Sequence, residues 1–198
     1  MLLTRIKDIL FDPRNTWIKI KEESAGFGQV LTNYAMPLAA IPAVFGLLGL
    51  TLVGHRYGFG PVIGVFRVPF GSALLWAIVM YILILVGLYV EGIVINALAP
   101  SFESKPNAVN AFKLAVYAYT PAFVAGILNI SPMLGFLVFL ISLYGIYLLY
   151  VGLPVMMETP KEKVAVYLIV IIVVMIVIYF VIGGIAGAIL AASWRPVF

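Results

Sequence analysis

Five long apolar stretches dominate this sequence and constrain what it can fold into. They run over about 29–53, 72–99, 107–130, 131–155 and 164–192, and a helix of roughly 20 apolar residues is long enough to cross a bilayer. Of the 198 residues, 64% are hydrophobic and only 10% are charged, whereas a soluble domain carries roughly 25% charged residues. The sequence therefore predicts an all-α, polytopic membrane bundle of five transmembrane helices.

An amphipathic segment precedes the first stretch. Leu3, Ile6 and Leu10 recur at helical spacing among charged residues, and Asp12-Pro13 is typical of a helix that restarts, with Asp as N-cap. Charges interrupt the short apolar run, so the segment does not fit a signal peptide. We expect an interfacial amphipathic helix or two, the alternative being a soluble helix that binds a partner. The chain thus divides into this segment over 1–28 and a membrane domain over 29–198.

The basic residues predict an orientation. With the N-terminus in the cytoplasm, the other side of the membrane holds Arg56, Arg67 and Arg195. The cytoplasmic side then holds most of the remaining basic residues, namely Arg5, Lys7, Arg14, Lys19, Lys21, Lys105, Lys161 and Lys163. By the positive-inside rule, the N-terminus is cytoplasmic and the C-terminus lies outside.

Two charged residues lie well inside apolar stretches, Glu91 in the second and Lys113 in the third. A rise of about 1.5 Å per residue places them at similar depths if these helices are antiparallel neighbours. Because a lone charge costs about 2.5–3.5 kcal/mol at the centre of a membrane helix, we expect the two side chains to pair. The pair is either an ion, proton or headgroup site or a purely structural contact; snorkelling to the interface is a further alternative.

Other polar residues accompany these charges. Asn110, Tyr117, Thr120 and Pro121 follow helical spacing from Lys113 and share its face. The candidate intramembrane polar site is the set Glu91, Asn96, Asn110, Lys113, Tyr117 and Tyr119.

The last stretch carries closely spaced small residues. Gly183, Gly184 and Gly187 begin ladders of the small-xxx-small type, which let helix backbones approach closely. We expect these glycines to be helix-packing positions, buried against another helix of the same chain or of a partner. The expected partners are therefore the lipid bilayer and either another membrane protein or a second copy of the chain.

Residues that carry catalytic chemistry are sparse. The chain has no cysteine, and its single histidine, His55, has no nearby carboxylates and is expected to be a loop residue. No phosphate-binding loop, metal-ligand cluster or Ser/His/Asp set is present. We expect no enzymatic activity, no cofactor and no nucleic-acid partner. The favoured function is a membrane-shaping or partner-binding scaffold. The alternative is a channel or transporter for an ion or small solute around Glu91 and Lys113, and an enzyme that acts on lipid is favoured least.

Several motifs run through nearly the whole chain in a fixed order. They are Phe11-Asp12-Pro13, Trp17, Glu22-Glu23, Pro37, Pro42, Ile95-Asn96-Ala97-Leu98-Ala99-Pro100, Ala118-Tyr119-Thr120-Pro121, Leu143-Tyr144-Gly145-Ile146-Tyr147, Gly152-Leu153-Pro154 and Thr159-Pro160-Lys161-Glu162-Lys163. Together they resemble the Yip domain family of Ypt/Rab-interacting membrane proteins, and specifically its short prokaryotic branch. The resemblance implies five spans, a cytoplasmic N-terminus and a prokaryotic inner membrane.

The eukaryotic members of this family bind prenylated Rab GTPases. That role is associated with a longer cytoplasmic tail and an Asp-Leu-Tyr-Gly-Pro motif, and neither is found in this sequence. The resemblance therefore implies a membrane protein and does not imply a Rab partner.

Overall fold

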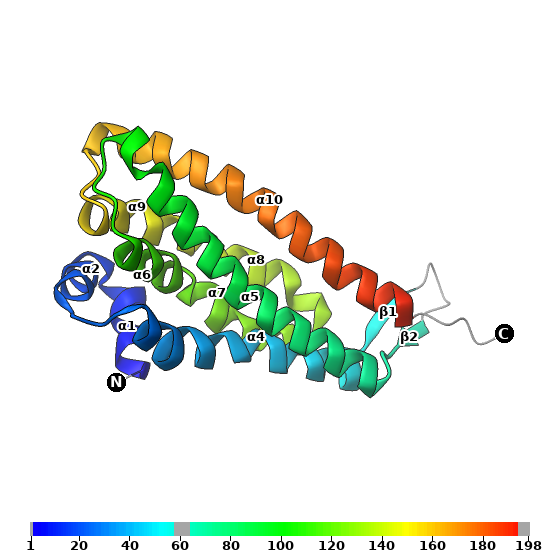
Figure 1. Ribbon diagram of the computed structural model, residues 1–198. Coiled ribbons are helices and arrows are strands. Elements are labelled where there is room, and N and C mark those ends of the chain that lie inside the picture. Colours follow the sequence, from blue (N-terminus) through cyan, green and yellow to red (C-terminus); the bar gives the residue numbers. More distant parts are fainter. Residues whose placement is uncertain (1, 58–63, 194–198) are drawn as a thin grey trace.

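The protein is almost entirely helical in the computed structural model, which describes residues 2–57 and 64–193 (Figure 1). Two short helices, α1 (Leu2–Phe11) and α2 (Pro13–Glu22), precede the membrane bundle. Five stretches are long and apolar enough to cross a membrane: Phe27–Val53, Phe70–Phe102, Ala108–Ile130, Gly135–Met156 and Lys161–Ile189. The predicted five-span membrane bundle with an N-terminal helix is confirmed.

Several of these spans are built from more than one helical segment. The first consists of α3 (Phe27–Val30), η1 (Leu31–Ala35), α4 (Met36–Leu48) and η2 (Gly49–Val53). The second is α5 (Phe70–Leu98) with η3 (Ala99–Phe102), and the third is α6 (Ala108–Ala118), α7 (Thr120–Ala125) and η4 (Gly126–Ile130). The fourth is α8 (Gly135–Ser142) and α9 (Tyr144–Met156) after the short η5 (Pro132–Leu134), and the fifth is α10 (Lys161–Ser193).

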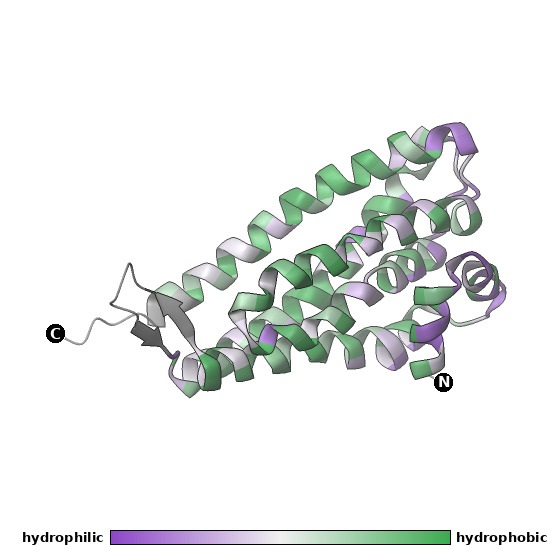
Figure 2. Cartoon of the chain, turned by 180° about the vertical axis from the view of Figure 1, so that it is seen from behind, coloured by the Kyte–Doolittle hydropathy of each residue, from purple (hydrophilic) through white to green (hydrophobic). Residues whose placement is uncertain are grey.

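The third span is the centre of the bundle. Every residue from Ala111 to Ala118 is buried, and α6 packs against α5 on one side and α9 on another. Helix α5 also packs against α4 and α10. The outer helices expose long rows of apolar side chains, and hydropathy colouring shows polar residues gathered at one end of the bundle (Figure 2).

A proline inside a membrane helix is accommodated by close packing. Pro42 lies inside α4, where it removes a backbone hydrogen bond and bends the helix. Gly126 of η4 lies against it so closely that a Cβ there would be 2.7 Å from the Cβ of Pro42. Only glycine allows these two spans to meet at this point.

A short antiparallel pair of strands lies between the first two spans. Strand β1 (His55–Tyr57) pairs with β2 (Gly64–Phe66), with His55 opposite Phe66. The pair lies at the end of the bundle where α10 finishes, far from α1 (Figure 1). His55 lies on β1, not in a loop.

Helices α1 and α2 cross the opposite end of the bundle, and do not extend along it (Figure 1). Asp12 is the N-cap of α2 and Pro13 takes its first position, as the sequence predicted, although the Asp12 side chain makes no capping bond. Its carboxylate instead accepts from Asn15 Nδ2 at 2.8 Å. Ile9, Trp17 and Ile20 are fully buried, so these two helices are docked onto the bundle.

Candidate functional site

The polar face of α6 is covered by the N-terminal helices. The Lys113 ammonium donates to the backbone carbonyl of Ile20 at 3.0 Å and to that of Glu23 at 2.7 Å. One turn earlier, Asn110 Nδ2 donates to the carbonyl of Met156 at 3.2 Å. Helix α6 therefore holds the end of α2 and the end of α9 through hydrogen bonds to backbone groups that the helices leave unpaired.

Local sequence explains where this face begins. The Asn107 side chain accepts from the backbone N–H of Asn110 at 3.0 Å and caps α6. From this fixed start, positions 110, 113 and 117 follow at three- and four-residue steps, so their side chains lie along one side of the helix. The structure brings these three predicted site residues together, and their partners come from α2, η1 and α9.

Aromatic rings continue the same face deeper into the bundle. Tyr117 meets Trp17 edge-to-face with centroids 6.3 Å apart, and Tyr34 from η1 at 4.4 Å. The hydroxyls of Tyr34 and Thr120 are 2.8 Å apart, and Thr120 donates to the carbonyl of Tyr117 at 2.7 Å. Such aromatic pairs add about 0.5–1.5 kcal/mol to their area burial.

Trp17 is the large anchor of the N-terminal segment. It is fully buried and lies over Gly152 of α9, where a Cβ would be 2.8 Å from the indole ring. Glycine is required here because the ring occupies the space of any side chain. At the junction between α2 and α9, the Trp17 ring therefore packs directly against the backbone of α9 at Gly152.

Arg5 ties α1 into the same junction. Its guanidinium forms an ion pair with Glu23 and lies 5.9 Å from the centre of the Tyr117 ring. The Tyr144 hydroxyl donates to the carbonyl of Leu10 at 2.8 Å, at the other end of α1. The two ends of α1 are thus each bonded to the rest of the protein.

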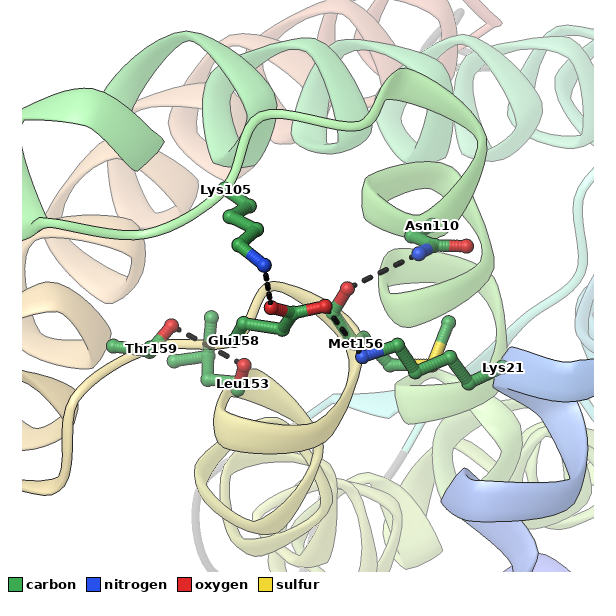
Figure 3. Close-up of polar contacts among 7 residues, drawn as sticks. All are labelled: Lys21, Lys105, Asn110, Leu153, Met156, Glu158 and Thr159. Atoms are coloured by element: carbon green, nitrogen blue, oxygen red, sulfur yellow. Dashed lines mark hydrogen bonds and ion pairs between the residues drawn. The ribbon is translucent and has the colours of Figure 1, made fainter.

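Glu158 joins three segments at this end of the bundle (Figure 3). Its carboxylate accepts from Lys21 of α2 at 2.9 Å and from Lys105, in the connection after η3, at 2.5 Å. The two ammonium groups, Lys105 foremost, lower the pKa of Glu158 to about 2. Glu158 has a positive φ of 51°, in the turn between α9 and α10. Glu158 was not predictable as a site residue, because its partners are 137 and 53 positions away in the sequence.

The same turn is fixed from beneath by Thr159. Its hydroxyl donates to the carbonyl of Leu153 at 3.2 Å and accepts from Ser104 at 2.9 Å. Both hydroxyls are buried, so each bond satisfies a group that would otherwise be unpaired. Figure 3 shows the Thr159–Leu153 bond beside the Glu158 ion pairs.

The predicted pairing of Glu91 with Lys113 is wrong. Helices α5 and α6 do meet beside these residues, since a Cβ on Gly92 would be 3.0 Å from the Cα of Phe112. Lys113, however, points to α2, and no ion pair joins it to Glu91. Similar depth in the membrane does not determine how each helix is rotated about its axis, and this rotation directs the two side chains apart.

Glu91 is buried without a complete set of partners. It is 2% exposed, and its Oε2 atom has no hydrogen-bond partner in the part of the chain that the structure describes. It follows Gly87 by four residues, and Gly87 faces Ile182 of α10, so Glu91 is on the side of α5 turned toward that helix. An ionised carboxylate is costly in such surroundings unless it is paired.

Asn96 and Tyr119 lie apart from the polar face of α6. Asn96 lines a cavity of about 380 Å³ with Phe27, Tyr89 and Phe112, and its Oδ1 is buried without a partner. Tyr119 stacks on Tyr179 of α10 with centroids 6.2 Å apart. The six predicted site residues therefore divide into three on the polar face of α6 and three elsewhere, with Glu91 and Asn96 on α5 and Tyr119 between α6 and α7.

The glycines of α10 are not buried against the rest of this chain. Gly183, Gly184 and Gly187 are exposed, and a Cβ at each would meet no atom of the described residues within 4 Å. The prediction that another helix of the same chain covers them is therefore wrong. Helix α10 diverges from its neighbours toward its C-terminal end (Figure 1). The spacing of small residues does not predict this divergence.

Comparison with known proteins decides the family. A family model for the Yip1 domain matches residues 7–190, which include the second half of α1, all of α2 and all five spans. The chain belongs to the Yip1 domain family. Inner membrane protein YohC of Escherichia coli, found in two strains, is 28% identical to this Yip1 chain over 151 residues, which are 73% of this chain and 74% of the relative. No solved structure matches the chain.

The motifs that carry the family resemblance have structural roles in this Yip1 domain. Trp17 and Gly152 form the contact between α2 and α9. Thr120 bonds the first span to the third, and Thr159 fixes the turn that bears Glu158. The chain is a membrane protein of this family, and several of its motif residues, among them Trp17 and Gly152, lie at the junction between the N-terminal helices and the bundle.

Proposed function

We propose that this protein organises the lipid bilayer as a non-enzymatic protein of a prokaryotic inner membrane, with its N-terminus in the cytoplasm. The described basic residues at the α1 end, from Arg5 to Lys163, support this orientation under the positive-inside rule. The inner-membrane location of the YohC relatives supports the compartment.

The outward face of α1 and α2 carries the proposal. Leu3, Phe11 and Ile18 are 74%, 84% and 48% exposed, and Lys7 and Arg14 are exposed between them. Apolar and basic side chains on one helical face are typical of helices that lie in the interface and contact anionic lipid. At the cytoplasmic end of the bundle, this face would insert three large side chains into one leaflet only.

The contacts of α1 and α2 with the bundle hold these inserted side chains in a fixed position. Lys113, Trp17 and the Arg5–Glu23 pair fix the two helices to the bundle. The exposed apolar side chains of α1 and α2 then form a wedge at a fixed depth. Each copy of the protein displaces lipid from one leaflet. This is the physical basis on which we assign membrane organisation.

Vesicle shape tests the proposal. The wild-type chain and a triple variant, Leu3→Gln, Phe11→Gln and Ile18→Gln, are reconstituted at equal density, and vesicle diameters are measured by electron cryomicroscopy. The matched control shortens three exposed α10 side chains, Val166→Ala, Val173→Ala and Val177→Ala. We expect the wild-type and control proteins to give more strongly curved vesicles than the triple variant does. Identical distributions for wild type and triple variant would contradict the proposal.

Transport is the second candidate, and the unpartnered Oε2 of Glu91 favours it. A buried carboxyl that lacks a partner in the chain is suited to bind a proton or a cation. Ion and proton flux into liposomes, compared between wild type and Glu91→Gln, separates the two functions. Flux that disappears with Glu91→Gln would establish transport, and the absence of flux in both folded proteins would leave the organising role.

A protein partner is a further part of the proposal. The exposed Gly183, Gly184 and Gly187 leave room for the close approach of a helix from another membrane protein or a second copy. Because the chain has no cysteine, Gly184→Cys introduces a single thiol. Disulfide dimers in native membranes would support self-association, and a purely monomeric product would exclude a Gly184 contact between copies.

A further inference from the structure

A second cavity, of about 700 Å³, lies between the N-terminal helices and the bundle. Its walls come from α1, from the end of α2 and the connection after it, from the first turns of the first span, and from α6. Tyr34 and Tyr117 form its floor and are nearly fully buried. Gln29 and Asn33 are exposed at its rim. The cavity therefore lies where the first span emerges from the bilayer, at the depth of lipid headgroups.

The cavity presents charges of both signs. Arg5 and Lys19 contribute the cations, and Asp8 and Glu23 contribute the anions. Arg5 and Glu23 are paired with each other. Lys19 and Asp8 form no ion pair with any described residue, so one ammonium and one carboxylate of the cavity remain available to a ligand.

The surface below the rim is apolar. Met36 and Val44, which follow Asn33 along the first span, are 37% and 49% exposed, and Pro37 is also exposed. A molecule with its polar group in the cavity would thus have an uninterrupted apolar surface for its hydrocarbon part. A soluble ligand has no hydrocarbon part that would contact that surface.

We propose that this cavity binds a phospholipid whose headgroup is zwitterionic, with a phosphate joined to a primary ammonium group. Lys19 binds the phosphate, and Asp8 binds the ammonium by charge-assisted hydrogen bonds. An anionic headgroup without an amine satisfies Lys19 and leaves Asp8 unpaired, so it binds more weakly. The inference does not depend on the proposed function, because a lipid occupies the cavity whether or not the protein bends the bilayer.

Native mass spectrometry of the full chain in detergent tests this proposal. The probes are phosphatidylethanolamine, phosphatidylglycerol of the same acyl chains, and free phosphoethanolamine. Binding is compared among wild type, Lys19→Gln, Asp8→Asn and Lys19→Arg, which keeps the charge. The matched controls, Lys161→Gln and Glu22→Gln, make the same charge changes at exposed positions outside the cavity.

We expect phosphatidylethanolamine to bind at least about tenfold more tightly than phosphatidylglycerol. Lys19→Gln and Asp8→Asn should each remove that preference, whereas Lys19→Arg and both controls should retain it. Tighter binding of phosphatidylglycerol, or insensitivity to Asp8→Asn, would overturn the zwitterionic assignment. If free phosphoethanolamine binds as tightly as phosphatidylethanolamine, the assignment of a lipid as the ligand is overturned. Thermal midpoints of all variants within about 2 °C of wild type show that a lost preference is not lost folding.

Discussion

The Lys113 ammonium lies 2.7 Å from the backbone carbonyl oxygen of Glu23, a residue 90 positions earlier in the chain. This bond joins the central helix of the bundle to the point where α2 ends. Lys113 is 2% exposed, and its charge is stabilised by carbonyl dipoles in place of a carboxylate. A lysine in the middle of an apolar stretch is thus explained as the anchor of a segment that crosses the end of the bundle.

Loss of that anchor should release the N-terminal segment. Lys113→Met leaves two buried carbonyls without a donor, which we expect to cost about 2–3 kcal/mol. Hydrogen exchange of residues 2–24, measured by mass spectrometry in nanodiscs, should accelerate while exchange within α5 stays slow. Lys161→Met, at an exposed position, is the control. Unchanged exchange in Lys113→Met would show that the lysine does not hold the segment.

Two glycines of this chain should respond in opposite ways to the same substitution. Gly152→Val inserts a side chain into the space of the Trp17 ring, whereas a Cβ at Gly183 would meet no described atom within 4 Å. Overpacking costs about 1–3 kcal/mol, so the thermal midpoint in detergent should fall by at least about 3 °C for Gly152→Val. Gly183→Val should leave the midpoint of the monomer unchanged. Equal shifts would argue against the Trp17–Gly152 contact.

The Glu158 ion pairs should weaken in acid. The pKa of Glu158 is lowered to about 2 by Lys105 and Lys21, against about 4.3 for a free glutamate. A lowered folded-state pKa means that the stabilisation is complete above about pH 4.3 and is lost as the pH falls toward 2. Pepsin cleavage, compared between wild type and Glu158→Gln, should differ most near pH 4.5 and converge near pH 2.

The control for that experiment is Glu103→Gln, which removes a different ion pair, with Lys163. At the N-terminal cleavage sites, the difference in pepsin cleavage between Glu103→Gln and wild type should not show the pH dependence expected for Glu158→Gln. A gap between wild type and Glu158→Gln that stays constant from pH 4.5 to pH 2 would show that the ion pairs do not stabilise the junction.

Single cysteines report the orientation of the chain, because the protein has none of its own. Asn15→Cys and Arg67→Cys place one thiol at each end of the bundle, at exposed positions. In intact cells a membrane-impermeant maleimide should label the thiol at position 67 and reach that at position 15 only after permeabilisation. The reverse pattern would invert the proposed topology.

The five spans were predictable because apolar length alone marks a membrane helix. The restart at Asp12-Pro13 was also predictable, since proline has a strong preference for the first turn. The polar side of α6 followed from the helical spacing of Asn110, Lys113 and Tyr117. These features depend on short-range geometry, which a sequence specifies directly.

Rotations and long-range partners were not predictable from one sequence. Lys113 was expected to face Glu91, but Gly92 and Phe112 form the α5–α6 contact and turn the lysine toward α2. The glycines of α10 were expected to be buried in the chain or by a partner, and are exposed because α10 diverges from the bundle. Depth in the membrane can be counted along a chain, whereas the direction of a side chain depends on packing.

The depth of the α1–α2 face in the bilayer tests the central claim most directly. A spin label at Phe11→Cys, in liposomes, is compared with one at Asn15→Cys, and the accessibility of each to oxygen and to a water-soluble nickel complex is measured. We predict that the label at position 11 is oxygen-accessible and shielded from nickel, as at the boundary between headgroups and acyl chains, with position 15 more accessible to nickel. Equal and full exposure of both labels to nickel would contradict an interfacial wedge.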